Sequence, residues 1–177
     1  MKITLETERL ILRPFEYGDA EEMFRAWASD PDTTKYLTWN PHGSVEVSRY
    51  VIEQWIKEYE KPERRNFAIT LKESGKLIGC IDVVGYLGGV SGTPVLGYVL
   101  GREYRNRGYM TEACRAVLDH LFKAGYPEVR IDAMQENEAS QRVIQKCGGV
   151  FTGTEVQDRP LKNDAVTVNI YIVKNRS

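Results

Sequence analysis

The chain has 177 residues, of which 42% are hydrophobic and 28% are charged, and this size and composition suit one compact domain over residues 1–177. Its 24 basic and 25 acidic residues leave a formal net charge of -1, so no overall basic field indicates a nucleic-acid partner. Any anion site must therefore be local. The three cysteines, Cys80, Cys114 and Cys147, are far apart in the chain and form no C-x-x-C pair, which argues against a disulfide framework or a zinc knuckle.

We also expect the chain to lack a targeting segment and a membrane-spanning segment. The first stretch, MKITLETERLILRPF, is too charged for a secretory signal, and no run approaches the roughly 18 apolar residues of a membrane span. Two histidines, His42 and His120, are too few for an ordinary histidine-rich zinc site. We therefore expect a cytoplasmic protein with reduced cysteines, no metal and no membrane partner.

The hydrophobic period alternates between two and about 3.6 along the chain, which predicts alternating strands and helices. The first third is predicted to hold a strand over residues 3–12, a helix that starts at a capping box of Asp19 and Glu22 and stops at Asp30-Pro31-Asp32, and a second helix that is capped by Ser44 and ends before Pro62. The charged stretch over residues 58–65 is predicted to be a solvated loop.

The rest of the chain continues the same rhythm. It predicts a hairpin of strands 67–71 and 77–84, a strand over 95–100, a third helix from Met110 to a stop at Gly125, a strand over 129–134, a fourth helix capped by Asn137 and ended by Gly148-Gly149, and an antiparallel strand over 166–173. The glycine-rich segment 85–92 precedes a strand rather than a helix, which excludes a P-loop and predicts a mobile hairpin loop.

A local anion site is predicted where the strand over 95–100 runs into the third helix. The connecting loop is Arg105-Asn106-Arg107-Gly108. The unpaired backbone amides and the positive dipole end of the helix face this loop. Gly108 lets an anion approach the backbone without a Cβ in the way, and the two arginines add charge. The pattern is therefore typical of a phosphate site.

The same residues resemble a known signature. R-x-x-G-x-M at Arg105, Gly108 and Met110 resembles the Q/R-x-x-G-x-G/A signature of the GCN5-related N-acetyltransferases, or GNAT family. Three further stretches, TERLILRPFEYGDAEEMFRAW, LGYVL and NEASQRVIQKCGG, resemble the branch that acetylates the N-termini of ribosomal proteins. The four matches occur in the same order and cover the chain from about residue 5 to about residue 153.

The resemblance implies a fold and a cosubstrate. The fold is α/β (α+β), with a mixed and mostly antiparallel central sheet that splays between strands 95–100 and 129–134 and is flanked by about four helices. The cosubstrate is acetyl-CoA, whose pyrophosphate is held by loop amides and whose pantetheine arm contacts the strand and the fourth helix. The cofactor-binding residues implied are Tyr98, Val99, Leu100, Arg105, Asn106, Arg107, Gly108, Tyr109, Met110 and Asn137.

Two positions depart from the family pattern. Met110 replaces a small residue, and we expect its side chain to turn into the core because it is in helical phase with Ala113. Ile144 lies where many members carry a tyrosine that protonates the departing thiolate. The family places a serine early in the fourth helix beside the cofactor sulfur, and Ser140 matches it. A hydroxyl is a weak acid, so we assign Ser140 to hydrogen bonding of the thiolate, with the proton supplied by water.

The acceptor side is less specific. The resemblance implies direct transfer to a primary amine without a covalent intermediate, and the amine could be a ribosomal or other peptide N-terminus, a polyamine or a drug. A catalytically silent acyl-CoA-binding module is the alternative. Candidate general bases are Asp82, Glu103, Asp132 and Glu155, and the aromatic residues that could form an acceptor wall are Trp27, Tyr36, Trp39, Tyr50 and Trp55.

Overall fold

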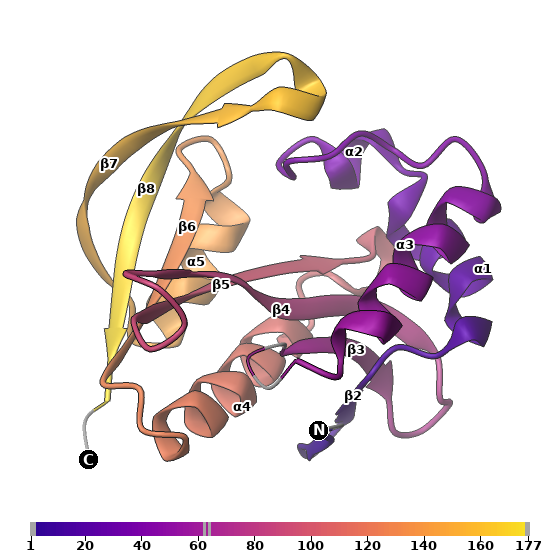
Figure 1. Ribbon diagram of the computed structural model, residues 1–177, viewed down its shortest axis with the longest axis horizontal. Coiled ribbons are helices and arrows are strands. Elements are labelled where there is room, and N and C mark those ends of the chain that lie inside the picture. Colours follow the sequence, from indigo (N-terminus) through magenta and orange to yellow (C-terminus); the bar gives the residue numbers. More distant parts are fainter. Residues whose placement is uncertain (1–2, 62, 64, 176–177) are drawn as a thin grey trace.

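The computed structural model describes residues 3–61, 63 and 65–175, and within them the strands form one 8-stranded sheet in the order β1-β2-β3-β4-β5-β6-β8-β7 (Figure 1). Every neighbouring pair is antiparallel except β5 and β6, which are parallel. The strands are β1 Leu5–Glu6, β2 Leu10–Arg13, β3 Asn66–Leu71, β4 Leu77–Leu87, β5 Thr93–Leu100, β6 Glu128–Met134, β7 Val150–Arg159 and β8 Asp164–Lys174. The predicted mixed, mostly antiparallel sheet is confirmed.

Helices cover both faces of this sheet (Figure 1). They are α1 Ala20–Met23, which continues into the π-helix η2 Phe24–Ala28, then α2 Pro31–Thr34, α3 Val45–Glu58, α4 Tyr109–Lys123 and α5 Glu138–Lys146, with short 3-10 turns η1 Tyr17–Asp19, η3 Arg102–Tyr104 and η4 Pro160–Lys162. Ser44 and Asn137 occupy the N-cap positions expected for α3 and α5, but only the Asn137 side chain makes a cap hydrogen bond. Pro62, expected to follow α3, lies outside the described residues.

Two apolar cores result from this layering. One packs α4 and Ile144 of α5 on β2 to β6 and β8, and Met110 is 5% exposed within it, so its side chain turns into the core as expected. The other packs α1, η2 and α3 on the opposite face, with Trp27 at 0% exposure. Successive β5 residues serve the two cores alternately: Leu96 belongs to the first and Val99 to the second.

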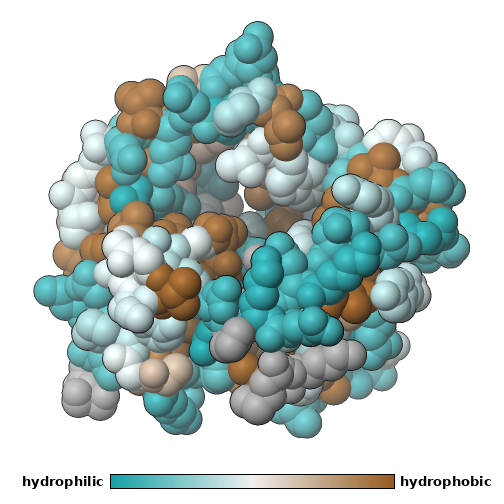
Figure 2. All heavy atoms as spheres, viewed as in Figure 1, coloured by the Kyte–Doolittle hydropathy of each residue, from teal (hydrophilic) through white to brown (hydrophobic). Residues whose placement is uncertain are grey.

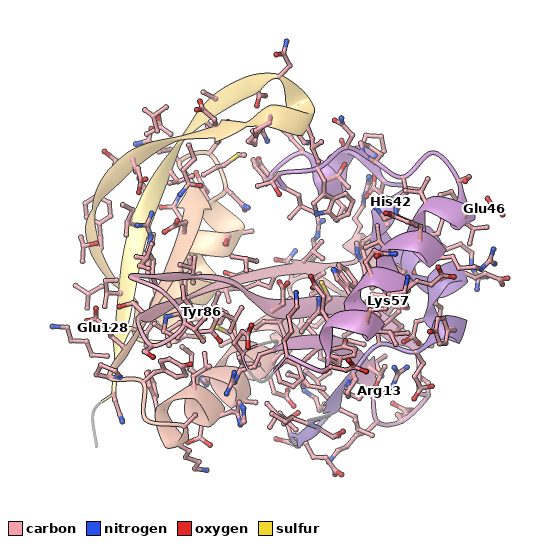
Figure 3. All side chains as sticks on the ribbon, in the orientation of Figure 1. Arg13, His42, Glu46, Lys57, Tyr86 and Glu128 are labelled. Atoms are coloured by element: carbon pink, nitrogen blue, oxygen red, sulfur yellow. The ribbon has the colours of Figure 1, made fainter. Side chains whose placement is uncertain are left out.

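The N-terminal elements differ from the prediction at two points. The strand expected over residues 3–12 is broken by a turn in which the Thr7 amide donates to the Leu10 carbonyl at 3.0 Å. Helix α1 begins at Ala20 with Asp19 at its N-cap, as expected, but the capping box lies one turn earlier, where the Asp19 carboxylate accepts from the Glu16 amide at 2.8 Å and closes the turn η1. Both Asp19 oxygens also bind Arg13 at 2.8 Å, at the end of β2 near α1 (Figure 3). Glu22 instead accepts from the Leu77 amide of β4 at 3.2 Å.

Strand β7 was not predicted at all. Most of its residues are exposed on both faces, so no buried face imposes an alternating pattern on the sequence. Its position comes from its antiparallel pairing with β8, which runs from Val150 to Arg159 with a register shift between Phe151 and Gly153. This edge strand is therefore specified by its partner rather than by its own hydrophobic period.

The predicted splay in the centre of the sheet is confirmed. Across the described strands, β5 and β6 pair at Val95 with Arg130 and at Leu96 with Ile131. Beyond these residues β5 continues to Leu100 and β6 to Met134, and the two strands diverge (Figure 1). The second half of β5 therefore keeps β4 on one side and has an open edge on the other.

We predict that Gly79→Ala destabilises the fold by about 1 to 3 kcal/mol, as overpacking of a well-packed core does. A Cβ at Gly79 of β4 would overlap the Val99 carbonyl and lie 3.1 Å from the Leu100 Cα, so it would force β4 away from β5. Urea unfolding measures the loss. Gly43→Ala is the matched control, because nothing lies within 4 Å of a Cβ there. Equal stability of the two variants would contradict the prediction.

Candidate active site

A cleft of about 1190 Å³ opens where β5 and β6 part. Its lining extends from the first turn of α4, along β5 and the start of α5, to the loop of residues 36–39 and to β7 and β8. Figure 2 shows the surface deeply hollowed at the corresponding central position. All the residues predicted to bind a cofactor line this cleft except Arg107, and so does Ser140.

The far end of the cleft is bridged by the β7–β8 hairpin. Around its tip, Arg159 Nη1 donates to the carbonyls of Lys35 at 2.9 Å and Leu37 at 3.2 Å. Lys162 Nζ donates to the Thr34 carbonyl at 2.7 Å, and Asn40 Nδ2 donates to the Leu161 carbonyl at 2.6 Å. The hairpin tip therefore meets the segment that follows α2 (Figure 1). We call this contact the bridge.

The loop before α4 has the backbone shape of an anion site. Asn106 and Gly108 both have left-handed backbone conformations, with φ of 61° and 80°. Gly108 is the N-cap of α4, and the Glu112 amide makes the helical bond to its carbonyl at 3.0 Å. The amides of Tyr109, Met110 and Thr111 precede that first bond and lie at the positive end of the helix dipole. They can therefore bind phosphate oxygens at the cleft.

An ion pair that sequence reasoning missed supports this loop from behind. Glu112, in the first turn of α4, accepts from Thr7 Oγ1 at 2.6 Å, from the Arg9 amide at 2.8 Å and from Arg9 Nε at 2.7 Å. Arg9 also donates to the Arg107 carbonyl at 3.0 Å and lies 4.5 Å from the centre of the Tyr109 ring. The turn between β1 and β2 thus fixes the loop.

The two loop arginines are placed differently from each other. Arg105 lines the cleft, and its guanidinium donates to the Leu100 carbonyl at 3.2 Å and to Thr33 Oγ1 at 2.8 Å. Arg107 is exposed and lies outside the cleft lining. Arg105 therefore links the end of β5 to α2 beside the cleft. The features of the loop that suit an anion are mainly those of its backbone.

The start of α5 brings a hydroxyl to the cleft. Asn137 Oδ1 accepts from the Ser140 amide at 3.1 Å, which uses the oxygen of its side chain for capping. Ser140 Oγ lies 2.9 Å from the Tyr98 hydroxyl of β5. Ile144, one turn further along, has 0% exposure and belongs to the core. The structure thus places the Tyr98 hydroxyl beside Ser140. The sequence had predicted only that the backbone of Tyr98 binds the cofactor.

The structure separates the four candidate bases. Glu103 lies outside the cleft lining. Asp132 binds Arg130 with both oxygens, at 2.7 and 2.9 Å, and Glu155 accepts from the same guanidinium at 2.6 Å. Asp82 lines the cleft from β4, and its Oδ2 lies 3.5 Å from Asn66 Nδ2. Of the four, Asp82 is the cleft carboxylate that is not held by Arg130.

Aromatic rings also line the cleft. Trp27, Tyr36, Trp39 and Trp55 are among the lining residues, whereas Tyr50 is 63% exposed and lies outside. Neither histidine lines the cleft. His42 bonds Ser48 at 2.7 Å and lies beside α3 (Figure 3). No group of three or more His, Cys, Asp or Glu among the described residues could hold a metal ion, and no described helix is long and apolar enough to cross a membrane.

Comparison with known proteins identifies the family to which the chain belongs. The model of the acetyltransferase (GNAT) domain matches residues 9–150. The chain belongs to the GNAT acetyltransferase family. This GNAT N-acetyltransferase is 28% identical over 148 residues to the probable N-acetyltransferase YjcK of Bacillus subtilis, covering 81% of this chain and 82% of YjcK.

Solved structures agree with this assignment. A GNAT-family acetyltransferase from Bacillus anthracis superposes with a TM-score of 0.83 at 27% identity, covering 97% of this chain and 98% of that one. RimL, described as a ribosomal L7/L12 α-N-protein acetyltransferase in complex with coenzyme A, superposes with a TM-score of 0.84 at 18% identity, covering 97% and 98%. The cleft of this GNAT enzyme therefore lies within a fold that these solved acetyltransferase structures share.

We predict that Glu112→Gln weakens the fold by about 1 to 2 kcal/mol near pH 7. Burial alone would raise the pKa of Glu112, but hydrogen bonds from Thr7 and Arg9 outweigh it and hold the pKa below its usual value. A carboxylate with a lowered pKa stabilises the fold above its unfolded pKa of about 4.3, and this contribution is lost as the pH falls through the folded value. The difference between wild type and variant should therefore shrink below about pH 4.3.

Urea unfolding of both proteins between neutral and acidic pH measures this difference. Glu138→Gln is the matched control, because Glu138 occupies the first turn of α5 with a side chain that is 82% exposed. A difference for Glu112→Gln that stayed constant with pH would refute the role of the ionised carboxylate.

Proposed function

We propose that this GNAT enzyme transfers the acetyl group of acetyl-CoA directly to a primary amine, and that the preferred acceptor is the α-amine of a peptide. The observation that carries the proposal is the cleft at the β5–β6 parting, which is lined by the start of α4, by aromatic rings and by Asp82. A phosphate-bearing donor and an amine can therefore meet between them.

The proposed binding of acetyl-CoA relies mainly on backbone groups. The pyrophosphate of acetyl-CoA accepts from the amides at the start of α4, where Gly108 leaves space. The pantetheine arm adds to the open edge of β5 as a strand would, using backbone groups of Tyr98, Val99 and Leu100. The Asn137 side-chain amide completes this contact from α5. The coenzyme A in the RimL complex supports the choice of donor.

The transfer needs no covalent intermediate on the enzyme. The amine nitrogen attacks the thioester carbonyl, the C–N bond forms, and the C–S bond breaks with its electron pair leaving on sulfur. The amine releases its proton to Asp82 or to water, and the thiolate later gains one from water. Ser140 donates a hydrogen bond to the sulfur as negative charge develops there, which stabilises the transition state more than the ground state.

The acceptor is inferred from the chemistry that the cleft offers. Transfer requires a neutral amine, and an α-amine with a pKa of about 7.7 to 8.0 is far more easily deprotonated than a lysine with a pKa of about 10.4. Asp132 and Glu155 are both paired with Arg130, so neither is readily available as a proton acceptor. An amine that deprotonates readily therefore suits this site. The description of RimL as an α-N-protein acetyltransferase is consistent with this choice.

We predict that Gly108→Asp weakens acetyl-CoA binding by at least about thirtyfold, roughly 2 kcal/mol. A Cβ at Gly108 would meet Arg9 Nη2 at 3.3 Å, and the added carboxylate would bring negative charge close to the amides proposed to bind phosphate. The fold should persist because aspartate tolerates a left-handed backbone better than most residues. Calorimetric titration with acetyl-CoA measures the loss. Gly43→Asp adds the same charge at an exposed position away from the cleft and should bind normally. A folded Gly108→Asp protein with wild-type affinity would rule out the phosphate site.

The acceptor is tested with matched peptides. A peptide with a free α-amine and no lysine should be acetylated at least about tenfold faster at pH 7.5 than one with a blocked N-terminus and a single lysine. The advantage should shrink as the pH rises toward about 10, because lysine then becomes neutral as well. Mass spectrometry of both products across this range gives the rates. A lysine peptide that is favoured throughout, or a polyamine or aminoglycoside favoured over both peptides, would overturn the proposed acceptor.

A further inference from the structure

The Tyr98 hydroxyl makes a contact that the binding of pantetheine by the β5 backbone does not explain. Its oxygen lies 2.9 Å from Ser140 Oγ and 3.2 Å from the Ser140 carbonyl. Tyr98 comes from the diverging half of β5, and Ser140 from the first turns of α5. Their contact therefore joins β5 to α5 where both line the cleft that is proposed to bind acetyl-CoA.

The direction of each hydroxyl hydrogen in the contact between Tyr98 and Ser140 can be inferred. Each hydroxyl carries one hydrogen and can accept from others. The Ser140 carbonyl lies inside α5, where the helical bond from the residue four positions later occupies one of its two acceptor sites, so it can accept from Tyr98 only as a second and longer bond, at 3.2 Å. The shorter distance is the one to Ser140 Oγ. The Tyr98 hydrogen is therefore best directed at Oγ, and the Ser140 hydrogen is then free to point into the cleft.

Tyr98 is suited to remain the donor in this pair. Burial, the largest cause, raises the pKa of Tyr98 far above its usual value near 10, and the neighbouring Cys114 adds to the rise. The phenol thus keeps its proton across the working range of pH. A fixed donor to Oγ increases the polarity of the Ser140 O–H bond, because hydrogen bonds in a chain polarise one another.

We propose that Tyr98 is a positioning residue that donates its hydroxyl hydrogen to Ser140 Oγ, so that Ser140 can donate its own hydrogen to the coenzyme A sulfur. The inference rests on the proposed function of Ser140. No proton leaves Tyr98 or Ser140 in this scheme. The thiolate leaves with its electron pair, is held by the Ser140 hydrogen, and is protonated by water. Loss of the Tyr98 hydroxyl would allow the Ser140 hydrogen to turn toward other acceptors.

The chain offers a matched control for the structural part of this contact. Tyr171 of β8 donates to Gln141 Oε1 of α5 at 2.8 Å, so its hydroxyl also fastens a strand to α5, one residue from Ser140. Tyr171 is 3% exposed and lies outside the cleft lining. Removing this hydroxyl loosens α5 without changing the hydrogen bonds of Ser140.

The test is a double-mutant cycle with single-turnover kinetics on the full chain, using acetyl-CoA and any amine that the enzyme accepts. Ser140→Ala should slow the chemical step by about ten- to a hundredfold, and Tyr98→Phe by about three- to tenfold. The double variant should match Ser140→Ala within about twofold. The KM for acetyl-CoA should change little in Tyr98→Phe, and Tyr171→Phe should keep the wild-type rate even if its Tm falls.

The outcomes distinguish the proposed role of Ser140 from the inferred role of Tyr98. If Ser140→Ala leaves the chemical step unchanged, the proposed role of Ser140 fails and the inference on Tyr98 fails with it. If Ser140→Ala is slow but Tyr98→Phe lowers the rate by the same factor in both backgrounds, Tyr98 acts independently of Ser140 and only the inference is overturned. A Tyr98→Phe variant that raises the KM for acetyl-CoA without slowing the chemical step also overturns it.

Discussion

The short pairing of β5 with β6 is the constraint on which the site depends. Two residue pairs hold these parallel strands together, and the strands then separate. Because each strand is still paired on its other side, with β4 and β8 respectively, the separation costs few hydrogen bonds and leaves an open edge on β5. Helix α5 follows β6 directly, and α4 follows β5 after the short turn η3. The N-termini of both helices therefore line one cleft.

A second constraint keeps the anion loop in shape. Asn106 and Gly108 lie close together and both have left-handed backbone conformations. A free loop would rarely populate this arrangement, and a non-glycine residue is strained in it. The contacts of Arg9 and Glu112 hold it from behind. The first strands thus do more than extend the sheet, because the turn between them organises amides about a hundred residues later in the chain.

The sequence predicted best the features that depend on neighbouring residues. The apolar spacing after Gly108 gave α4 and the inward turn of Met110, and Asn137 marked the cap of α5. Features set by tertiary contact escaped prediction. Strand β7 has no buried face, and the Tyr98–Ser140 bond joins residues 42 positions apart. A tyrosine in an apolar strand is ordinarily a core residue, so only its neighbours in space reveal the hydroxyl's partner.

The bridge has a consequence for how the two halves of the cleft are assembled. Its hydrogen bonds join residues 121 to 128 positions apart, so they close long loops and are expected to form late in folding. Few bonds hold it, and none involves the β1–β2 turn or the start of α4. Local opening of the bridge would release the hairpin tip from the segment that follows α2, while the bonds of Arg9 and Glu112 behind the loop before α4 stayed intact. Formation of the bridge is thus a late step that joins the hairpin to the first third of the chain, whereas the anion loop already has its own support.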